Sequence, residues 1–152
     1  MTLQVGQPAP EFELTDHTGA RVKLSDHRGK RPVALVFYPF AFSGICTGEL
    51  CEIRDNISIF EDDDVQVLAI SCDPVYSLRA FADAEGYSFP LLSDFWPHGE
   101  VAKAYGVFGE AAGRAVRGTF LIDKEGAVRW SVVNSPGEAR PLAAYREALA
   151  GL

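Results

Sequence analysis

Two cysteines separated by four residues, Cys46 and Cys51, are the side chains whose type and spacing most directly suggest chemistry in this sequence. A thiolate is a strong nucleophile and is readily oxidised, whereas a protonated thiol is nearly inert. Pro39 and Ser43 precede the first cysteine at short intervals, and Arg117 lies directly before a late apolar segment. The chemistry to be tested is therefore nucleophilic or redox catalysis by a thiol.

The segment around Cys46 is expected to run from a strand into a helix. Residues 32–37 form a continuous apolar run that is typical of a buried strand, and Pro39 ends it. Ser43 is a candidate N-cap residue for the helix that follows. Apolar side chains then recur at three- and four-residue steps, which predicts one amphipathic helix through Cys46, Leu50, Ile53, Ile57 and Phe60.

This position favours a reactive cysteine but does not suffice for one. Unpaired backbone N–H groups and the helix dipole favour a thiolate in the first helical turn. Lowering an ordinary cysteine pKa by two units requires about 2.7 kcal/mol, whereas a helix end contributes ~0.3–1 kcal/mol. We therefore expect a cation near Cys46.

Length and composition favour one domain spanning residues 1–152, with a substantial apolar core. The chain is 47% hydrophobic, and its formal net charge of −7 argues against nucleic acid and anionic membranes as partners. No apolar run is long enough to span a membrane, and no basic segment followed by an apolar one opens the chain. A cytoplasmic location is expected, where three cysteines do not form a disulfide scaffold.

The remaining elements alternate as in an α/β protein. A hairpin is expected from residues 12–14 and 22–24, and residues 113–117 form a loop. The other predicted elements are strands 65–71 and 89–92, helices 75–85, 101–105 and 142–149, and a final hairpin of 119–122 with 128–133. This order predicts a thioredoxin-like fold, in which a central mixed sheet is flanked by helices and carries an N-terminal β-hairpin extension.

The expected topology supplies the missing cation. If strand 119–122 runs antiparallel to strand 32–37, its amino end lies at the carboxyl edge of that strand. Open α/β folds place their functional sites at this edge. Arg117 is therefore expected close to Cys46.

The other thiols and the ring side chains have simpler interpretations. Cys51 is expected on the polar side of its helix with Thr47, Arg54 and Ser58, which favours a redox role over burial. Cys72 ends a buried strand and is expected to be structural, with a secondary redox role as the alternative. The aromatic residues of the 93–99 loop pack locally or form a dimer contact. The three histidines, expected to be solvated in turns, are His17, His27 and His98.

The set Pro39-x-x-x-Ser43-x-x-Cys46, with Arg117 before the Thr-Phe-x-Ile-Asp strand, resembles the pattern of the peroxiredoxins. The similarity covers essentially the whole chain, from the Gly6-x-x-Ala9-Pro10-x-Phe12 opening onwards. Residues 93–99 and 104–108 look most like the alkyl hydroperoxide reductase E subgroup. The Cys-x4-Cys spacing is instead similar to that of peroxiredoxin Q.

This resemblance implies a thiol-dependent peroxidase that reduces hydrogen peroxide and organic hydroperoxides without a cofactor. Cys46 attacks the peroxide and becomes a sulfenic acid. Ser43 and Arg117 bind the reacting oxygens, and Pro39 shields the sulfur from water. The resemblance makes Glu49 the residue that orients the arginine, and Cys51 or an external thiol resolves the sulfenate.

The resemblance also implies partners. The reductant is expected to be thioredoxin, a glutaredoxin-like protein or a low-molecular-weight thiol, and the chain is expected to form a homodimer through the 39–43 and 95–96 loops. Two other functions stay open from the residues themselves. A thiol–disulfide oxidoreductase normally carries Cys-x-x-Cys, and a metal-binding or copper-delivery module needs a further soft ligand, although no histidine follows His98.

Overall fold

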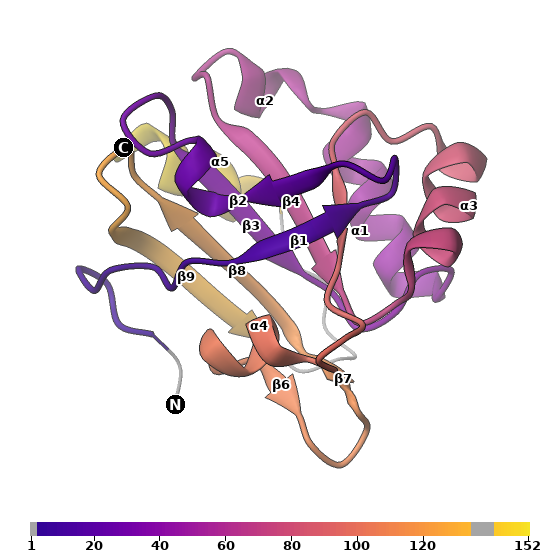
Figure 1. Ribbon diagram of the computed structural model, residues 1–152. Coiled ribbons are helices and arrows are strands. Elements are labelled where there is room, and N and C mark those ends of the chain that lie inside the picture. The colour runs from indigo at the N-terminus through magenta and orange to yellow at the C-terminus, as the bar shows by residue number, and fades with distance from the viewer. Residues whose placement is uncertain (1–2, 135–141) are drawn as a thin grey trace.

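We describe residues 3–134 and 142–152 of a computed structural model, and only the backbone of residues 45–47 and 134. A seven-stranded mixed sheet forms its centre, with strand order β2-β1-β5-β4-β3-β8-β9 (Figure 1). Strands β3, β4 and β5 are parallel, whereas β8 and β9 continue the sheet in antiparallel pairs. The predicted thioredoxin-like mixed sheet is thereby confirmed. The strands are β1 (Glu13–Asp16), β2 (Arg21–Lys23), β3 (Val33–Phe37), β4 (Gln66–Ser71), β5 (Leu91–Ser93), β8 (Arg117–Ile122) and β9 (Val128–Asn134).

Five α-helices are present in the described residues: α1 (Gly44–Asp55), α2 (Ser58–Glu61), α3 (Val75–Glu85), α4 (Glu100–Ala104) and α5 (Leu142–Ala150). The prediction of one helix reaching Phe60 is wrong, because the chain leaves helical geometry at Asn56 (φ −124°). The Asn56 side-chain amide donates to the carbonyl of Glu52 at 2.9 Å, a local bond that competes with helix continuation. None of the helices in the described ranges is long and apolar enough to cross a bilayer.

The central strands are apolar throughout because both faces of the sheet are covered. In β3, all five residues are buried. Ala34 and Val36 face the core formed with α1, α2, α3 and α5. Val33, Leu35 and Phe37 face the second core, formed with the N-terminal segment and α4. Alternation of side chains along a strand therefore divides one continuous apolar run between two cores.

The N-terminal hairpin extends the sheet at one end. Strands β1 and β2 pair with each other, and β1 also pairs antiparallel with β5, so the predicted hairpin is confirmed. The prediction of a loop over 113–117 is wrong. Strand β7 (Arg114–Ala115) pairs with β6 (Phe108–Gly109) in a small separate sheet, and Arg117 is already the first residue of β8. Strands of two residues have too little periodicity to be recognised in a sequence.

Candidate active site

The carboxyl end of β3 meets the amino end of β8 at one edge of the sheet. Phe37, the last residue of β3, is the register partner of Gly118. Arg117 precedes Gly118 and therefore lies at the edge where the chain leaves β3 towards α1. The prediction of its place in the sheet is confirmed. The strand pairing, rather than nearness in sequence, brings residue 117 to the 39–43 loop.

The 39–43 loop is held in place by the connection between β4 and α3. The backbone N–H of Ala41 donates to Asp73 Oδ2 at 2.8 Å, and the Ser71 hydroxyl donates to the same oxygen at 2.7 Å. Phe42 adopts a left-handed backbone conformation, with φ of 68°, and its ring centroid lies 4.9 Å from that of Phe81. A non-glycine residue rarely adopts this conformation, and one that does is worth examining for function. The entry into α1 is thus fixed before the helix begins.

Ser43 and Pro39 occupy the positions that the sequence predicts for them. Pro39 is buried two residues after the end of β3, and exposed Ser43 is the N-cap residue of α1, as predicted. The Ser43 side chain makes no capping hydrogen bond. The third residue of α1 is Cys46, in the turn whose backbone N–H groups lack partners within the helix.

Arg117 and Glu49 form a buried ion pair between β8 and α1. Their side chains are 2% and 5% exposed, and Arg117 Nη1 donates to Glu49 Oε1. Glu49 stands three residues after Cys46 in the same helix, and positions three apart are neighbours on a helix surface. The ion pair therefore ties the arginine to the side of α1 on which residue 46 lies. The contact predicted for Glu49 is present.

Sequence reasoning missed a second cation beside the loop. The Arg114 guanidinium lies 5.9 Å from the ring centroid of Phe40, which follows Pro39. Contacts of this kind contribute about 0.5–1 kcal/mol at exposed sites. Arg114 belongs to the small β6–β7 sheet, an element that the sequence did not reveal. The β6–β7 hairpin thus packs a basic side chain against the loop that leads into α1.

Cys51 has a more elaborate environment than predicted. Its side chain is half-buried and packs against the core beneath α1, so the assignment to a polar helix face is wrong. The thiol donates to Glu85 Oε2 at 3.3 Å, and its Sγ lies 3.5 Å from the Tyr87 hydroxyl. Arg54 completes the group, since it hydrogen-bonds the backbone carbonyl of Glu85 and lies 3.7 Å from that residue's carboxylate. The helical wheel could not reveal Glu85 and Tyr87 as partners, because they lie at and just beyond the end of α3.

Cys72 is structural, as its place at the end of β4 suggested. It is 2% exposed, and burial raises the pKa of its thiol to about 11. A thiol with this pKa remains protonated and unreactive at neutral pH.

The expectation of solvated histidines is wrong for all three. His17 Nδ1 accepts a hydrogen bond from the backbone N–H of Leu91 at 3.1 Å. The ring nitrogens of His98 lie 2.7 Å and 3.2 Å from the carbonyl oxygens of Gly113 and Phe95. His27 is half-buried, and burial lowers its pKa. The His17 and His98 side chains join neighbouring segments, which turn assignments alone do not disclose.

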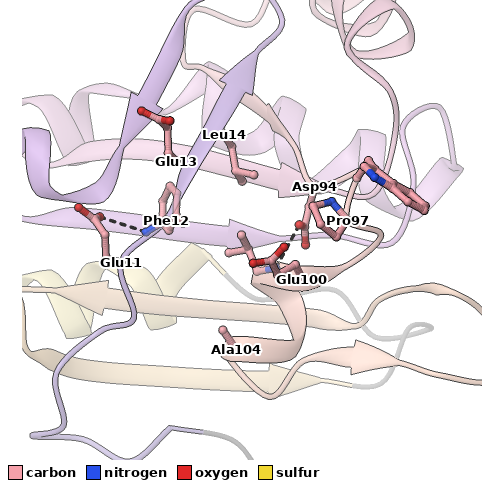
Figure 2. A pocket seen from close by; sticks show the side chains of 10 residues that line it. Glu11, Phe12, Glu13, Leu14, Asp94, Pro97, Glu100 and Ala104 are labelled. Carbon is pink, nitrogen blue, oxygen red and sulfur yellow. Dashed lines mark hydrogen bonds between the residues drawn. The ribbon is translucent and has the colours of Figure 1, made fainter.

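A separate pocket of about 130 Å³ lies between β1 and α4. Figure 2 shows Glu11, Glu13, Asp94 and Glu100 among its lining residues. None of the described site residues line it, so it does not belong to the thiol site. Asp94 accepts hydrogen bonds from the backbone N–H groups of Val101 and Ala102, which makes its carboxylate a cap for the start of α4. Across the described ranges, no three histidine, cysteine or acidic side chains are grouped so as to hold a metal ion.

Comparison with known proteins assigns the family. Residues 5–131 match the model of the AhpC/TSA family. Alkyl hydroperoxide reductase E of Mycobacterium tuberculosis is 49% identical over 150 residues, which cover 99% of this chain and 98% of that protein. The crystal structure of peroxidoxin BcpB from the same organism gives a TM-score of 0.84 at 34% sequence identity. The match covers 97% of this chain and 95% of the BcpB chain. The crystal structure of Enterococcus faecalis AhpC gives a TM-score of 0.90 at 28% sequence identity. The match covers 99% of this chain and 92% of the AhpC chain. The chain therefore belongs to the AhpC/TSA family and is a peroxiredoxin, a thiol-dependent peroxidase.

Proposed function

We propose that Cys46 is the peroxidatic cysteine and that hydrogen peroxide and organic hydroperoxides are its substrates. The Cys46 thiolate attacks the terminal peroxide oxygen, the O–O bond breaks, and the sulfur retains that oxygen as a sulfenic acid. The other oxygen departs with a proton as water or an alcohol. The observation that carries this proposal is the ion-paired Arg117 at the carboxyl edge of β3, tied by Glu49 to the side of α1 where position 46 lies.

Four further residues have roles that follow from their chemistry. Arg117 stabilises both the thiolate and the charge that spreads over the breaking O–O bond, and Glu49 orients it. A guanidinium has five N–H donors, enough for a carboxylate and a second anionic group together. The Ser43 hydroxyl accepts a hydrogen bond from the peroxide and donates one to its oxygen, a role supported by the absence of a capping bond from this side chain. Pro39 has no N–H and shields the sulfur from water.

Regeneration of the enzyme requires thiols. In the proposed cycle, Cys51 attacks the Cys46 sulfenic acid to form a disulfide within one chain. Thioredoxin, a glutaredoxin-like protein or a low-molecular-weight thiol then reduces that disulfide. This cycle requires a compartment that maintains reduced thiols, so we assign the protein to the cytoplasm.

The proposed working unit is a homodimer that covers the aromatic residues near the site. Phe42, Phe95 and Trp96 are 57%, 47% and 81% exposed. Large aromatic side chains are enriched in protein interfaces. A second copy packed on the 39–43 and 95–96 loops would remove them from water.

Stopped-flow mixing of the reduced protein with one equivalent of hydrogen peroxide tests the central assignment. We expect rapid loss of the Cys46 thiol, followed by that of Cys51, in the wild type and no thiol loss in Cys46→Ser, with the circular dichroism spectrum unchanged. Retention of more than a trace of peroxide consumption by Cys46→Ser would exclude Cys46 as the reacting residue. Cys72→Ala is the matched control, because that thiol is buried and protonated.

A further inference from the structure

The Cys51 thiol is surrounded by groups that can accept and compensate its proton. Glu85, the last residue of α3, accepts the thiol hydrogen at 3.3 Å. The Tyr87 hydroxyl lies 3.5 Å from the same sulfur. Arg54 approaches from α1 and lies 3.7 Å from the Glu85 carboxylate. A carboxylate, a phenol and a guanidinium thus surround one half-buried thiol.

From this geometry we propose that Glu85 is the proton acceptor for Cys51 when Cys51 resolves the sulfenate. The inference rests on the proposed function, because it requires a sulfenic acid at Cys46. A carboxylate in hydrogen-bond contact with the proton that must be removed meets the geometric condition for a general base. An inert core thiol would require no such partner.

The surrounding groups are suited to the charge that the transfer creates. Burial raises the pKa of Tyr87, so its hydroxyl keeps its hydrogen and can donate it to the sulfur anion. Arg54 places positive charge beside the same anion. Glu85 becomes neutral as the sulfur becomes negative, so the cluster keeps the same total charge.

The disulfide also requires a rearrangement of α1. Cα atoms five residues apart in an intact helix are roughly 8.6 Å apart, whereas a disulfide requires less than ~7 Å. Cys46 and Cys51 both lie in α1, so the helix between them must unwind. Transfer of the proton to Glu85 makes the Cys51 sulfur nucleophilic while it still accepts hydrogen bonds from the protonated Glu85 carboxyl and from Tyr87. Unwinding of α1 then carries the thiolate away from these donors and towards the Cys46 sulfur.

The reaction balances without another reactant. The Cys51 thiol gives its proton to Glu85, and the resulting thiolate sulfur attacks the Cys46 sulfur. The S–S bond forms and the S–OH bond breaks. The departing hydroxide takes a proton, resupplied by Glu85 through solvent, and leaves as water. In formal oxidation state, the Cys51 sulfur is oxidised by one electron and the Cys46 sulfur is reduced by one, so no other oxidant or reductant is needed.

The test separates the two thiol steps by rapid quenching. Reduced protein is mixed with one equivalent of hydrogen peroxide and alkylated at intervals. Peptide mapping then follows loss of the Cys46 thiol and appearance of the Cys46–Cys51 disulfide. The variants are Glu85→Gln, which retains the side-chain shape but is a poor base, and Glu85→Asp, which retains a carboxylate. Asp83→Asn is the matched control, because it removes an exposed carboxylate from the same helix.

We expect Glu85→Gln to form the disulfide at least about a hundredfold more slowly at neutral pH, the lower end of the ~10²–10⁴-fold range of general-base effects. Its rate should rise about tenfold per pH unit, because solvent must then remove the proton. Glu85→Asp should retain a rate that varies little with pH, and Asp83→Asn should match the wild type.

Three results would overturn the assignment. Equal disulfide rates in Glu85→Gln and the wild type would show that no proton passes to Glu85. If Glu85→Gln and Glu85→Asp both form the disulfide equally slowly and without pH dependence, Glu85 contributes only packing and does not accept the proton. If the wild-type protein loses the Cys46 thiol but forms no Cys46–Cys51 disulfide, then Cys51 does not resolve the sulfenic acid and the proposed proton transfer does not occur. That last result would leave the peroxidase function standing, whereas an unreactive Cys46 would reject the proposed function first.

Discussion

Glu49 and Arg117 form an ion pair in which both side chains are almost completely buried, one on α1 and the other at the start of β8. Burial removes both charges from water, so each depends on the other for compensation. The pair joins the helix that carries Cys46 to the sheet edge that carries the arginine. Loss of the ion pair should therefore affect both the stability of the fold and the rate of the peroxide reaction. Variants of Arg117 test the effect on the rate, and a variant of Glu49 tests the effect on stability.

The first prediction concerns the arginine as a group that binds the reacting oxygens. Arg117→Ala should slow the reaction with hydrogen peroxide by a factor on the order of a hundred, as loss of a positioned oxyanion donor does. Arg117→Lys should recover only part of the rate, since an ammonium cannot replace the planar fork of donors. The second-order rate constant from stopped-flow measurements checks both variants. An unchanged constant in Arg117→Ala would place the residue outside the site.

The second prediction concerns the carboxylate partner. Glu49→Gln leaves a buried guanidinium without its counter-charge and should cost about 3–5 kcal/mol of unfolding free energy. Urea denaturation measures this loss. Glu52→Gln, an exposed change in the same helix, should alter stability by less than ~0.5 kcal/mol. Equal stability of the two variants would contradict a structural role for the ion pair.

The third prediction follows from the pKa of Cys72, which burial raises to about 11. An unfolded cysteine loses its proton near pH ~8.5, whereas folded Cys72 retains its own, so the native state binds more protons above that pH. Stability should consequently fall as pH rises from about 8.5 to 10, by at most about 1.4 kcal/mol per pH unit from this group. Cys72→Ala should reduce that slope in urea titrations. An identical slope in the variant would contradict the assigned pKa.

The fourth prediction concerns the glycine beside the arginine. A Cβ placed on Gly118 would lie 2.9 Å from Val107 Cγ1, which is closer than packing allows. Gly118→Ala should therefore destabilise the fold by about 1–3 kcal/mol. The double variant Gly118→Ala/Val107→Ala should show non-additive stability, because it removes the clashing methyl group. Additive losses would mean that the clash is relieved in another way.

The fifth prediction tests the dimer. Trp96→Ala removes the most exposed of the loop aromatics and should weaken association, whereas Tyr76→Ala, which removes another exposed aromatic residue on α3, should not. Sedimentation velocity at micromolar concentration measures both. A wild type that sediments only as a 16.5 kDa species would reject the homodimer.

The sequence was most informative where local pattern and topology agreed. The apolar run of β3 and the periodicity of α3 predicted those elements closely, because burial on both faces or on one face leaves a simple signature. The position of Arg117 followed from the antiparallel pairing of β8 with β3. Its contact with Glu49 did not follow from periodicity, and only the family resemblance pointed to it.

The features that the sequence concealed depend on contacts between distant segments. Cys51 occupies a polar position on a helical wheel, yet its thiol meets residues 34 and 36 positions later in the chain. The break at Asn56 interrupts an apolar period that continues across it, so periodicity could not locate it. Arg114 approaches Phe40 from a two-residue strand that has no local signal. In each of these three cases the local structure is determined by contacts with segments distant in the sequence, which sequence patterns do not reveal.

Helix α3 holds the segment around α1 from both of its ends. Before α3, the Asp73 carboxylate accepts a hydrogen bond from the backbone N–H of Ala41. At the last residue of α3, the backbone carbonyl of Glu85 accepts one from Arg54. The residues on either side of the stretch 42–53 are thus hydrogen-bonded to the two ends of the same helix, α3. In the proposed cycle, opening of α1 between residues 46 and 51 would leave both of these contacts in place. The proposed disulfide would then be exposed to an outside reductant while the sheet stays paired, at the energetic scale of a few helical hydrogen bonds rather than of global unfolding.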